Sequence, residues 1–203
     1  MRQLALAPRC LQAYGHGRVK MTDIMRGYFG VGVEGVSKPF NIGNLMRSAH
    51  AFGAGFVFTI AAEYAGAGSD TAKTTAKHHA HVPFYQFDSV AGLTLPKGCA
   101  LVGIELMDEA VDLPSFPHPL NAAYVLGPER GSLSPALIER CDHIVRIPAR
   151  FSINLGVAGA IVLYDRMLTL GRFGDRPLNP RATSTPRPPH VFGAPIRRRS
   201  KPN

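Results

Sequence analysis

Cysteine is scarce in this chain of 203 residues, which holds only three, and they lie far apart. No two of them form a C-x-x-C pair, so neither a zinc site nor a disulfide framework is indicated, and a reducing cytoplasm is the simple interpretation. Long apolar runs are also lacking, since the longest candidate, 155–170, is interrupted by Asp165 and Arg166. Because a membrane helix requires roughly 20 apolar residues, no membrane partner is expected.

Acidic residues are almost absent from the C-terminal segment. The chain has a formal net charge of +9, and residues 172–203 contribute most of it, with eight basic residues against one acid. This segment is also rich in proline, a composition that predicts a disordered tail. Two interpretations of the tail remain open: a solvated tail, or a flexible arm that binds the phosphates of RNA.

The first twenty residues also lack acids and hold four basic residues, which faintly resembles an organelle transit segment. We favour a simpler interpretation, in which residues 1–27 form an N-terminal extension and Met21 is an alternative start. A single domain is then expected over residues 28–171, a length sufficient to bury a sizeable core.

Between the two ends, apolar residues recur with the periods of strands and helices. Short apolar or alternating runs predict strands at 28–33, 56–60, 82–87, 101–106, 123–126 and 143–147. Helical spacing predicts helices at 42–52, 69–80, 89–93, 135–140 and 154–170. The expected N-caps are Asn41, Asp88 and Ser134, and Gly53 is expected to end the first helix. Strands alternate with helices, so we expect an α/β fold with a mostly parallel sheet and helices on both faces.

The stretch Gly30-Val-Gly-Val-Glu-Gly35 fits the spacing G-x-G-x-x-G of dinucleotide-binding loops. Such a loop needs a helix that starts directly after its glycines, whereas here residues 36–40 intervene and include Pro39. The acid that would bind the ribose is also poorly placed, because the nearest acid at a strand end is Glu63, 28 positions after Gly35. An NAD-dependent oxidoreductase is therefore the least supported of the functions considered.

Three other motifs place polar residues at predicted strand ends and helix starts. They are NIGNLMRSAHAFG at 41–53, YVLGPERGSL at 124–133 and RIPARFSINLGVA at 146–158. In this order and spacing they resemble the three signature motifs of the SpoU (TrmH-like) RNA ribose 2′-O-methyltransferases of the SPOUT superfamily. Two departures are present: Gly131 comes one position earlier than the corresponding glycine of the family, and Gly156 stands where a serine is common.

The resemblance implies a fold that periodicity does not predict, because true knots are almost absent from proteins. The α/β domain would end in a C-terminal trefoil knot that holds S-adenosylmethionine largely through backbone groups. Matching motif positions assign the cofactor contacts to Ile104, Glu105, Gly127, Ile147 and Leu155. The family also implies a homodimer packed through the first-motif helix and the last helix, and the broad apolar arc of 154–170 suits burial on two sides.

The same resemblance assigns catalytic roles to Asn41, Arg47, Glu129, Ser152 and Asn154. Without the family, Arg47 would be interpreted as a solvated helix residue. Within the family it is the catalytic arginine, which holds a phosphate or helps to remove the proton from the ribose 2′-hydroxyl. The pKa of arginine is about 12.5–13.8, so acting as a base at neutral pH would need a large shift of this pKa, whereas holding a phosphate needs none.

The other four residues lie beside predicted turns. Asn41 and Asn154 are also candidate helix caps, and Ser152 shares a face with Asn154 if the stretch between them is extended. Glu129 follows a Gly-Pro turn and is either an exposed acid or, as the family implies, an acceptor of backbone N–H groups from the knot loops. Together they would hold the ribose oxygen in line with the methyl group at about 3 Å.

The predicted substrate is tRNA or rRNA, and no metal is expected. Besides Arg47, Lys73, Lys77 and Arg150 are candidates for contacts to the RNA backbone, although a solvated face is the default for the two lysines. The histidines within 77–81 have no further cysteine or carboxylate nearby, so they do not indicate a metal site. The alternative function is a catalytically silent knotted protein that binds RNA or the cofactor.

Overall fold

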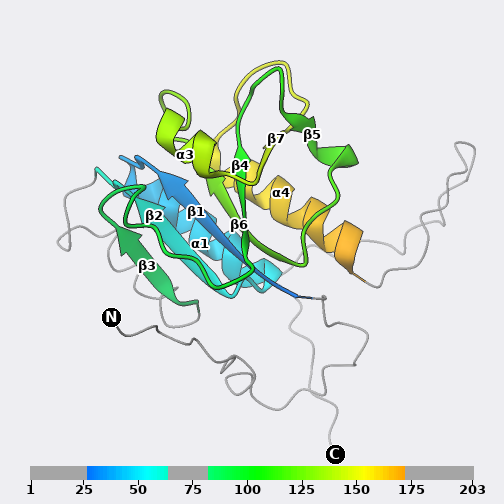
Figure 1. The fold of residues 1–203 in the computed structure, drawn as a ribbon, viewed down its shortest axis with the longest axis horizontal. Coiled ribbons are helices and arrows are strands. Elements are labelled where there is room, and N and C mark those ends of the chain that lie inside the picture. The colour runs from blue at the N-terminus through cyan, green and yellow to red at the C-terminus, as the bar shows by residue number, and fades with distance from the viewer. Residues whose placement is uncertain (1–26, 64–81, 172–203) are drawn as a thin grey trace, which may run out of the picture. The chain divides into compact units, whose positions relative to one another are not determined.

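The computed structural model describes residues 27–63 and 82–171. In chain order its elements are β1 (Tyr28–Glu34), α1 (Pro39–Phe52), β2 (Phe56–Ile60), β3 (Phe84–Phe87), β4 (Ala100–Ile104), β5 (Val111–Asp112), the short 3₁₀ helix η2 (Leu113–Ser115), β6 (Asn121–Leu126), α3 (Pro135–Arg140), β7 (His143–Arg146) and α4 (Leu155–Leu170). The strands form one seven-stranded sheet in the order β3-β2-β1-β6-β4-β7-β5, and all neighbouring pairs are parallel (Figure 1). The predicted α/β class and parallel sheet are thereby confirmed.

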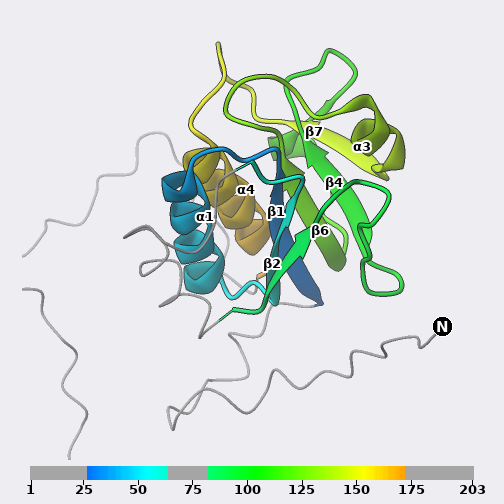
Figure 2. The ribbon, with the colours of Figure 1, turned by 90° about the vertical axis from the view of Figure 1, so that its left-hand side faces the viewer.

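Helices cover both faces of this sheet, as predicted. α1 and α4 lie side by side on one face (Figure 2), where Leu45 and Val162 share a hydrophobic core with Val31 of β1. On the opposite face, Leu137 of α3 belongs to a second core with Phe58 of β2. Alternate side chains of each strand point to opposite faces, so one parallel sheet supplies both cores.

The glycines of the G-x-G-x-x-G stretch belong to β1 and to the turn after it. A side chain at Gly30 would lie 2.2 Å from the ring of Phe56, and one at Gly32 would lie 2.5 Å from the ring of Phe58. These two glycines therefore make room for aromatic rings of the neighbouring strand. Gly35 has a φ of +60°, which favours glycine, and it turns the chain toward α1.

The first helix begins earlier than predicted. α1 starts at Pro39, and Lys38 before it has the extended backbone of an N-cap residue without a capping hydrogen bond from its own side chain. Asn41 lies inside the first turn, so the prediction that Asn41 is the N-cap was wrong. The fixed φ of proline suits the first helical position and moves the start of the helix to Pro39. The predicted end is confirmed, because Gly53 has a left-handed φ of +76°.

Other boundaries differ by a few residues. The segment 89–93 is a turn rather than a helix, with the N–H of Gly92 donating to the carbonyl of Ser89. β3 is shorter than predicted at its start and β4 at its end, while β5 and η2 were not predicted because each has only two or three residues. Ser134 and Asn154 do cap α3 and α4. The helix predicted at 69–80 lies outside the described residues, among which no helix is long and apolar enough to span a membrane.

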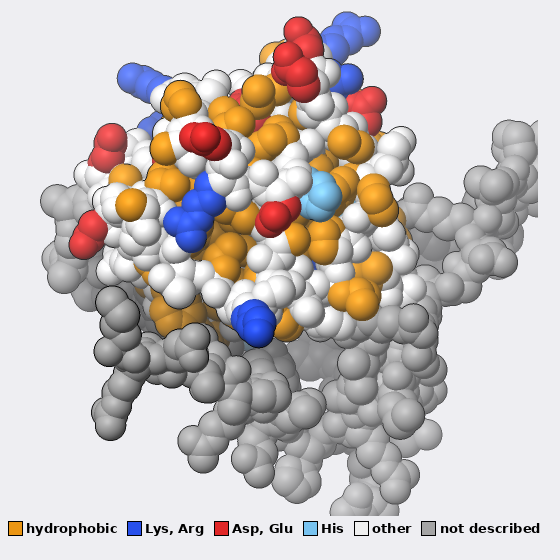
Figure 3. All heavy atoms as spheres, viewed as in Figure 1, with side chains coloured by type: hydrophobic (Ala, Val, Ile, Leu, Met, Phe, Trp, Pro, Cys, Tyr) orange, Lys and Arg blue, Asp and Glu red, His pale blue; other side chains and the backbone are white. Residues whose placement is uncertain are grey.

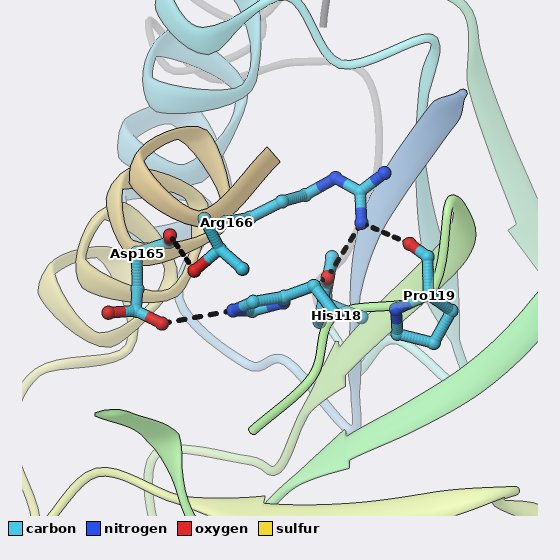
Figure 4. A network of polar contacts seen from close by, with 6 residues as sticks. His118, Pro119, Asp165 and Arg166 are labelled. Atoms are coloured by element: carbon cyan, nitrogen blue, oxygen red, sulfur yellow. Dashed lines mark hydrogen bonds and ion pairs between the residues drawn. The ribbon is translucent and has the colours of Figure 1, made fainter. Parts of the chain in front are cut away.

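Arg166, which interrupts the apolar run of α4, is fully buried. Its guanidinium donates to the carbonyl of Pro119 at 2.5 Å and to the hydroxyl of Tyr124 at 3.0 Å (Figure 4). His118 lies 2.6 Å from that hydroxyl and 3.0 Å from the carboxylate of Asp165. Burial lowers the pKa of His118, against the opposing effect of Asp165. The network joins α4 to the segment that leads into β6.

Candidate functional site

A cavity of about 410 Å³ opens at the carboxyl ends of β4, β6 and β7, beside the start of α4. This edge of an open parallel sheet is where ligands usually bind in α/β folds. All five predicted cofactor positions line the cavity: Ile104, Glu105, Gly127, Ile147 and Leu155. The structure therefore brings together residues that are up to 51 positions apart in the chain.

Four of the five predicted catalytic residues line the same cavity: Asn41, Glu129, Ser152 and Asn154. Asn154 caps α4, since its Oδ1 accepts the N–H of Gly156 at 2.9 Å. Its Nδ2 donates to Oδ1 of Asn41 at 3.3 Å, and Nδ2 of Asn41 donates to Oε1 of Glu129 at 2.8 Å. A chain of polar contacts thus connects the starts of α1 and α4 with the loop after β6.

Glu129 holds the residues just before α1, including the N-cap residue Lys38, from another loop. Its carboxylate accepts the backbone N–H groups of Ser37 and Lys38, each at 3.3 Å, and the hydroxyl of Ser37 at 3.2 Å. The family resemblance implied backbone N–H groups of the knot loops, whereas those bonded here belong to the loop between β1 and α1. Burial alone would raise the pKa of Glu129, but the hydrogen bonds from Asn41 and the backbone outweigh it and lower the pKa. The negative charge also suits the positive end of the helix dipole.

We predict that Glu129→Ala lowers the free energy of unfolding by about 1–2 kcal/mol at neutral pH, because Ser37, Lys38 and Asn41 lose their hydrogen bonds to the carboxylate. The lowered pKa of folded Glu129 means that the unfolded chain is protonated first as the pH falls. The contribution of Glu129 to stability is therefore fully present above its ordinary pKa of 4.5. It is lost as the pH drops through the lower pKa that Glu129 has in the folded protein. Urea denaturation at neutral and acidic pH measures this difference.

Glu139→Ala, which removes an exposed acid of α3, serves as the matched control and should leave the unfolding midpoint nearly unchanged. An equal loss for both variants, or a Glu129→Ala deficit that persists unchanged at acidic pH, would contradict this stabilising role.

Glu105 and Gly127 shape the wall of the cavity. The Glu105 carboxylate accepts the N–H of Leu106 at 2.9 Å and that of Leu133 at 2.7 Å, which ties the loop after β4 to the loop before α3. A side chain at Gly127 would lie 3.2 Å from the nitrogen of Leu133 and 3.4 Å from the Glu105 carboxylate, so there is little room for one. Gly131, the early glycine of the second motif, has a φ of +120° that favours glycine.

Arg47 does not line this cavity. It lies on the exposed side of α1 and borders a second hollow between α1 and α4, together with Phe52, Val157 and Tyr164. Asn154 borders both hollows, so they meet at the start of α4. The structure thus unites four of the predicted catalytic residues and places the fifth on the neighbouring surface.

The predicted RNA contacts are only partly described. Arg150 is exposed between two residues that line the cavity, Ala149 and Phe151. Lys73 and Lys77 lie outside the described residues, as do the histidines within 77–81. Among the residues that the structure does describe, no group of three potential metal ligands occurs. On the face shown in Figure 3, the described Lys and Arg side chains lie mostly apart from one another rather than in one patch.

Sequence reasoning missed two residues of the cavity rim, Lys38 and Phe151. Lys38 lies three positions before Asn41 and Phe151 directly precedes Ser152, but the motifs assign neither of them a role. Phe151 had a usable signal, because a large apolar side chain between polar neighbours in a predicted loop has no core to join.

Comparison with known proteins gives a consistent result. A model of the SpoU rRNA Methylase family matches residues 29–164. The 23S rRNA (guanosine-2′-O-)-methyltransferase RlmB of Coxiella burnetii is 29% identical over 143 residues, and that of Nitrosomonas europaea is 30% identical over 142. Each alignment covers 66% of this chain, but 55% and 53% of the relative. The chain therefore spans little more than half the length of these relatives.

Solved structures share the fold. The rRNA methyltransferase of Sinorhizobium meliloti with bound AdoMet has a TM-score of 0.63 at 24% identity, covering 71% of this chain and 57% of that one. A protein solved in work on 2-OH methylation of C/U34 on tRNA has a TM-score of 0.62 at 24% identity, covering 71% and 97%. At this identity, the likeness concerns the fold alone.

Proposed function

Because this chain belongs to the SpoU rRNA methylase family, we propose that it is an S-adenosylmethionine-dependent enzyme that methylates a ribose 2′-hydroxyl in rRNA or tRNA. The observation that carries this proposal is the cavity at the carboxyl ends of β4, β6 and β7. It gathers the five expected cofactor positions and four polar residues expected at the reaction. The names of the similar rRNA and tRNA enzymes support both RNA classes.

The cavity suits S-adenosylmethionine in size and chemistry. Its volume of about 410 Å³ lies within the range of about 300–1,000 Å³ that is usual for small-molecule sites. Ile104, Ile147 and Leu155 would offer apolar surface to the adenine, while Gly127 would offer its backbone groups. The Glu105 carboxylate would keep the two adjoining loops in place, since both of its oxygens already accept backbone N–H groups.

In this proposal S-adenosylmethionine supplies an electrophilic methyl group, and the residues of the chain position the acceptor. Asn41, Glu129 and Asn154 hold the starts of α1 and α4 rigid, so that Ser152, exposed in the loop before α4, can orient the ribose. Arg47 would bind the phosphate next to that ribose as a fixed positive charge. A guanidinium remains protonated at neutral pH, so positioning and charge neutralisation are its contribution.

The proposal includes a trefoil knot and a homodimer. For the knot, the supporting observation is that β7 pairs between β4 and β5 although it follows both in the chain. An experimental structure that traces residues 105–171 would test the threading.

For the dimer, the support is the exposed apolar surface of α4, where Val157 is 52%, Ile161 37% and Tyr164 46% accessible. Because this surface lies beside Arg47, the association of two chains through it would bring Arg47 of one subunit to the active site that the dimer completes.

We also propose that residues 28–171 form the methyltransferase domain, with an N-terminal extension over 1–27 and a tail over 172–203. The cytoplasm, where reduced cysteines persist, is the proposed location; Cys99 and Cys141 are free thiols.

Titration calorimetry and methylation mapping test the function together. S-adenosylmethionine is expected to bind both the full chain and a chain cut after Gly171, and NAD to bind neither. Ribose-methylation mapping of total RNA should reveal one site that disappears when the gene is deleted and returns with it. Cofactor binding without any lost site would favour the silent RNA-binding alternative. Binding of NAD in place of S-adenosylmethionine would favour the oxidoreductase.

A further inference from the structure

Phe151 is exposed in an unusual place. Ile104, Leu126 and Leu155 in the cavity wall are at most 9% accessible, whereas Leu106 is 46% and Phe151 75% accessible, the highest value among the large apolar residues that line the cavity. Its ring therefore lies at the mouth rather than in the wall. A single exposed apolar residue is common on protein surfaces, but this ring borders the cavity, where a bound ligand would cover it and remove its apolar surface from water.

The charges around the mouth favour a polyanion that carries flat apolar groups. The two acids of the cavity, Glu105 and Glu129, are turned toward backbone N–H groups and are occupied there. Three exposed cations stand on the loops that form the rim: Lys38, Arg130 and Arg150. Lys38 lines the cavity itself, and the two arginines each lie next to residues that line it.

We propose that Phe151 is the stacking platform for the base of the target nucleotide, and that Lys38, Arg130 and Arg150 contact the phosphates on either side. This inference rests on the proposed function, because it places the base at the mouth of the cavity assigned to the methyl donor. Aromatic side chains recognise RNA bases by stacking when those bases are unstacked from their neighbours. Basic side chains at the same rim would bind the backbone without regard to sequence.

The proposal narrows the class of substrate. A base within a duplex is covered on both faces by its neighbours, so its face is not available to Phe151 unless the nucleotide is extruded. The target nucleotide is therefore unpaired, in a loop or a single-stranded segment, or is flipped out when the protein binds. A regular double-stranded segment of RNA is a poor ligand for this rim.

The chain contains no tryptophan, which allows a direct optical test. Phe151→Trp introduces the sole tryptophan of the protein at the mouth. Phe40→Trp is the matched control, because Phe40 is similarly exposed, at 71%, but does not line the cavity. The probe is a mixed-sequence oligoribonucleotide of about 12 nucleotides, at low salt and with S-adenosylmethionine present, and the same strand paired with its complement.

We expect the single strand to quench the emission of Phe151→Trp strongly, and the duplex, or either RNA with Phe40→Trp, to quench it weakly. Equal quenching of the two variants would overturn the proposal, as would unchanged emission of Phe151→Trp when filter binding shows that RNA is bound. Absence of RNA binding would also count against it. A strongly blue-shifted emission without RNA would mean that protein already covers the ring, which would overturn it as well.

A kinetic test separates stacking from mere apolar contact. In methyl transfer to total RNA, Phe151→Leu should raise the KM for RNA by about tenfold, whereas Phe151→Tyr should leave it within about twofold and neither should change the affinity for S-adenosylmethionine. Equal KM values for the two variants would exclude a stacking role. If the unaltered protein transferred no methyl group, the proposed function would fail, and the fluorescence result would still decide the stacking proposal.

Discussion

Arg47→Ala is expected to reduce methyl transfer by about 10²–10³-fold or more, the loss typical of a charge-stabilising group at a reaction centre. The core is not disturbed, because Arg47 is exposed on α1 and the helix packs through Ile42, Leu45, Met46 and Ala49. The affinity for S-adenosylmethionine should remain, since Arg47 lies outside the cavity. Single-turnover methylation of RNA and calorimetry with the cofactor measure the two quantities.

Two further variants sharpen this test. Arg47→Lys keeps the charge but loses the planar, two-pronged donor geometry, so it should recover only part of the activity. Lys97→Ala removes an exposed charge from a turn far along the chain and should retain full activity. Arg47 borders the α1–α4 surface proposed for the dimer, so a loss of activity could also arise from a lost dimer. Sedimentation excludes this if all variants show the same assembly. Retained turnover in Arg47→Ala would remove this residue from the mechanism.

The position of Arg47 also shows where prediction from sequence reaches its limit. The five positions that the family resemblance assigns to the cofactor line one cavity, because most of them lie at or just after the carboxyl ends of parallel strands, which meet at the same edge of the sheet. No such rule connects a side chain in the middle of a helix with that edge. The sequence predicted that Arg47 is solvent-exposed on its helix, which the structure confirms, but not how far it lies from the cavity.

The predictions of the helix starts succeeded or failed for a similar reason. Ser134 and Asn154 were predicted correctly because each accepts N–H groups only two or three residues ahead, so the whole interaction lies in a short stretch of sequence. The start of α1 was placed wrongly at Asn41. The N–H groups of Ser37 and Lys38, just before the helix, donate to Glu129, which is about 90 residues away in the chain. Hydrogen bonds supplied from another loop leave no local pattern to detect.

Arg166 is the clearest case of a residue whose environment could not be predicted locally. Its guanidinium lies 5.1 Å from the centre of the Phe29 ring and donates to carbonyl groups just before β6, so a charge within an apolar helix is compatible with complete burial. Besides the hydroxyl of Tyr124, the partners are backbone carbonyls of a distant segment, which every residue type provides. The sequence therefore cannot distinguish this position from an exposed arginine.

We predict that Arg166→Met lowers the free energy of unfolding by about 3–5 kcal/mol, although methionine fills much of the same volume. The carbonyls of Pro119 and Leu120, which lie 2.5 and 2.6 Å from the fully buried guanidinium, would lose charged donors that methionine cannot replace. α4 would also lose its attachment to the segment before β6. Urea denaturation followed by circular dichroism measures the change.

Thr169→Ala is the control on the same helix, because Thr169 is exposed and its hydroxyl donates only to the carbonyl of Asp165 within α4. It should alter the free energy of unfolding by no more than about 0.5 kcal/mol. If Arg166→Met unfolded at the same urea concentration as the unaltered protein, the carbonyls before β6 would have to find other donors, and Arg166 would not be what fastens α4. A large loss confined to Arg166→Met would instead establish that the helix carrying Asn154 at its start is held in place from its opposite end.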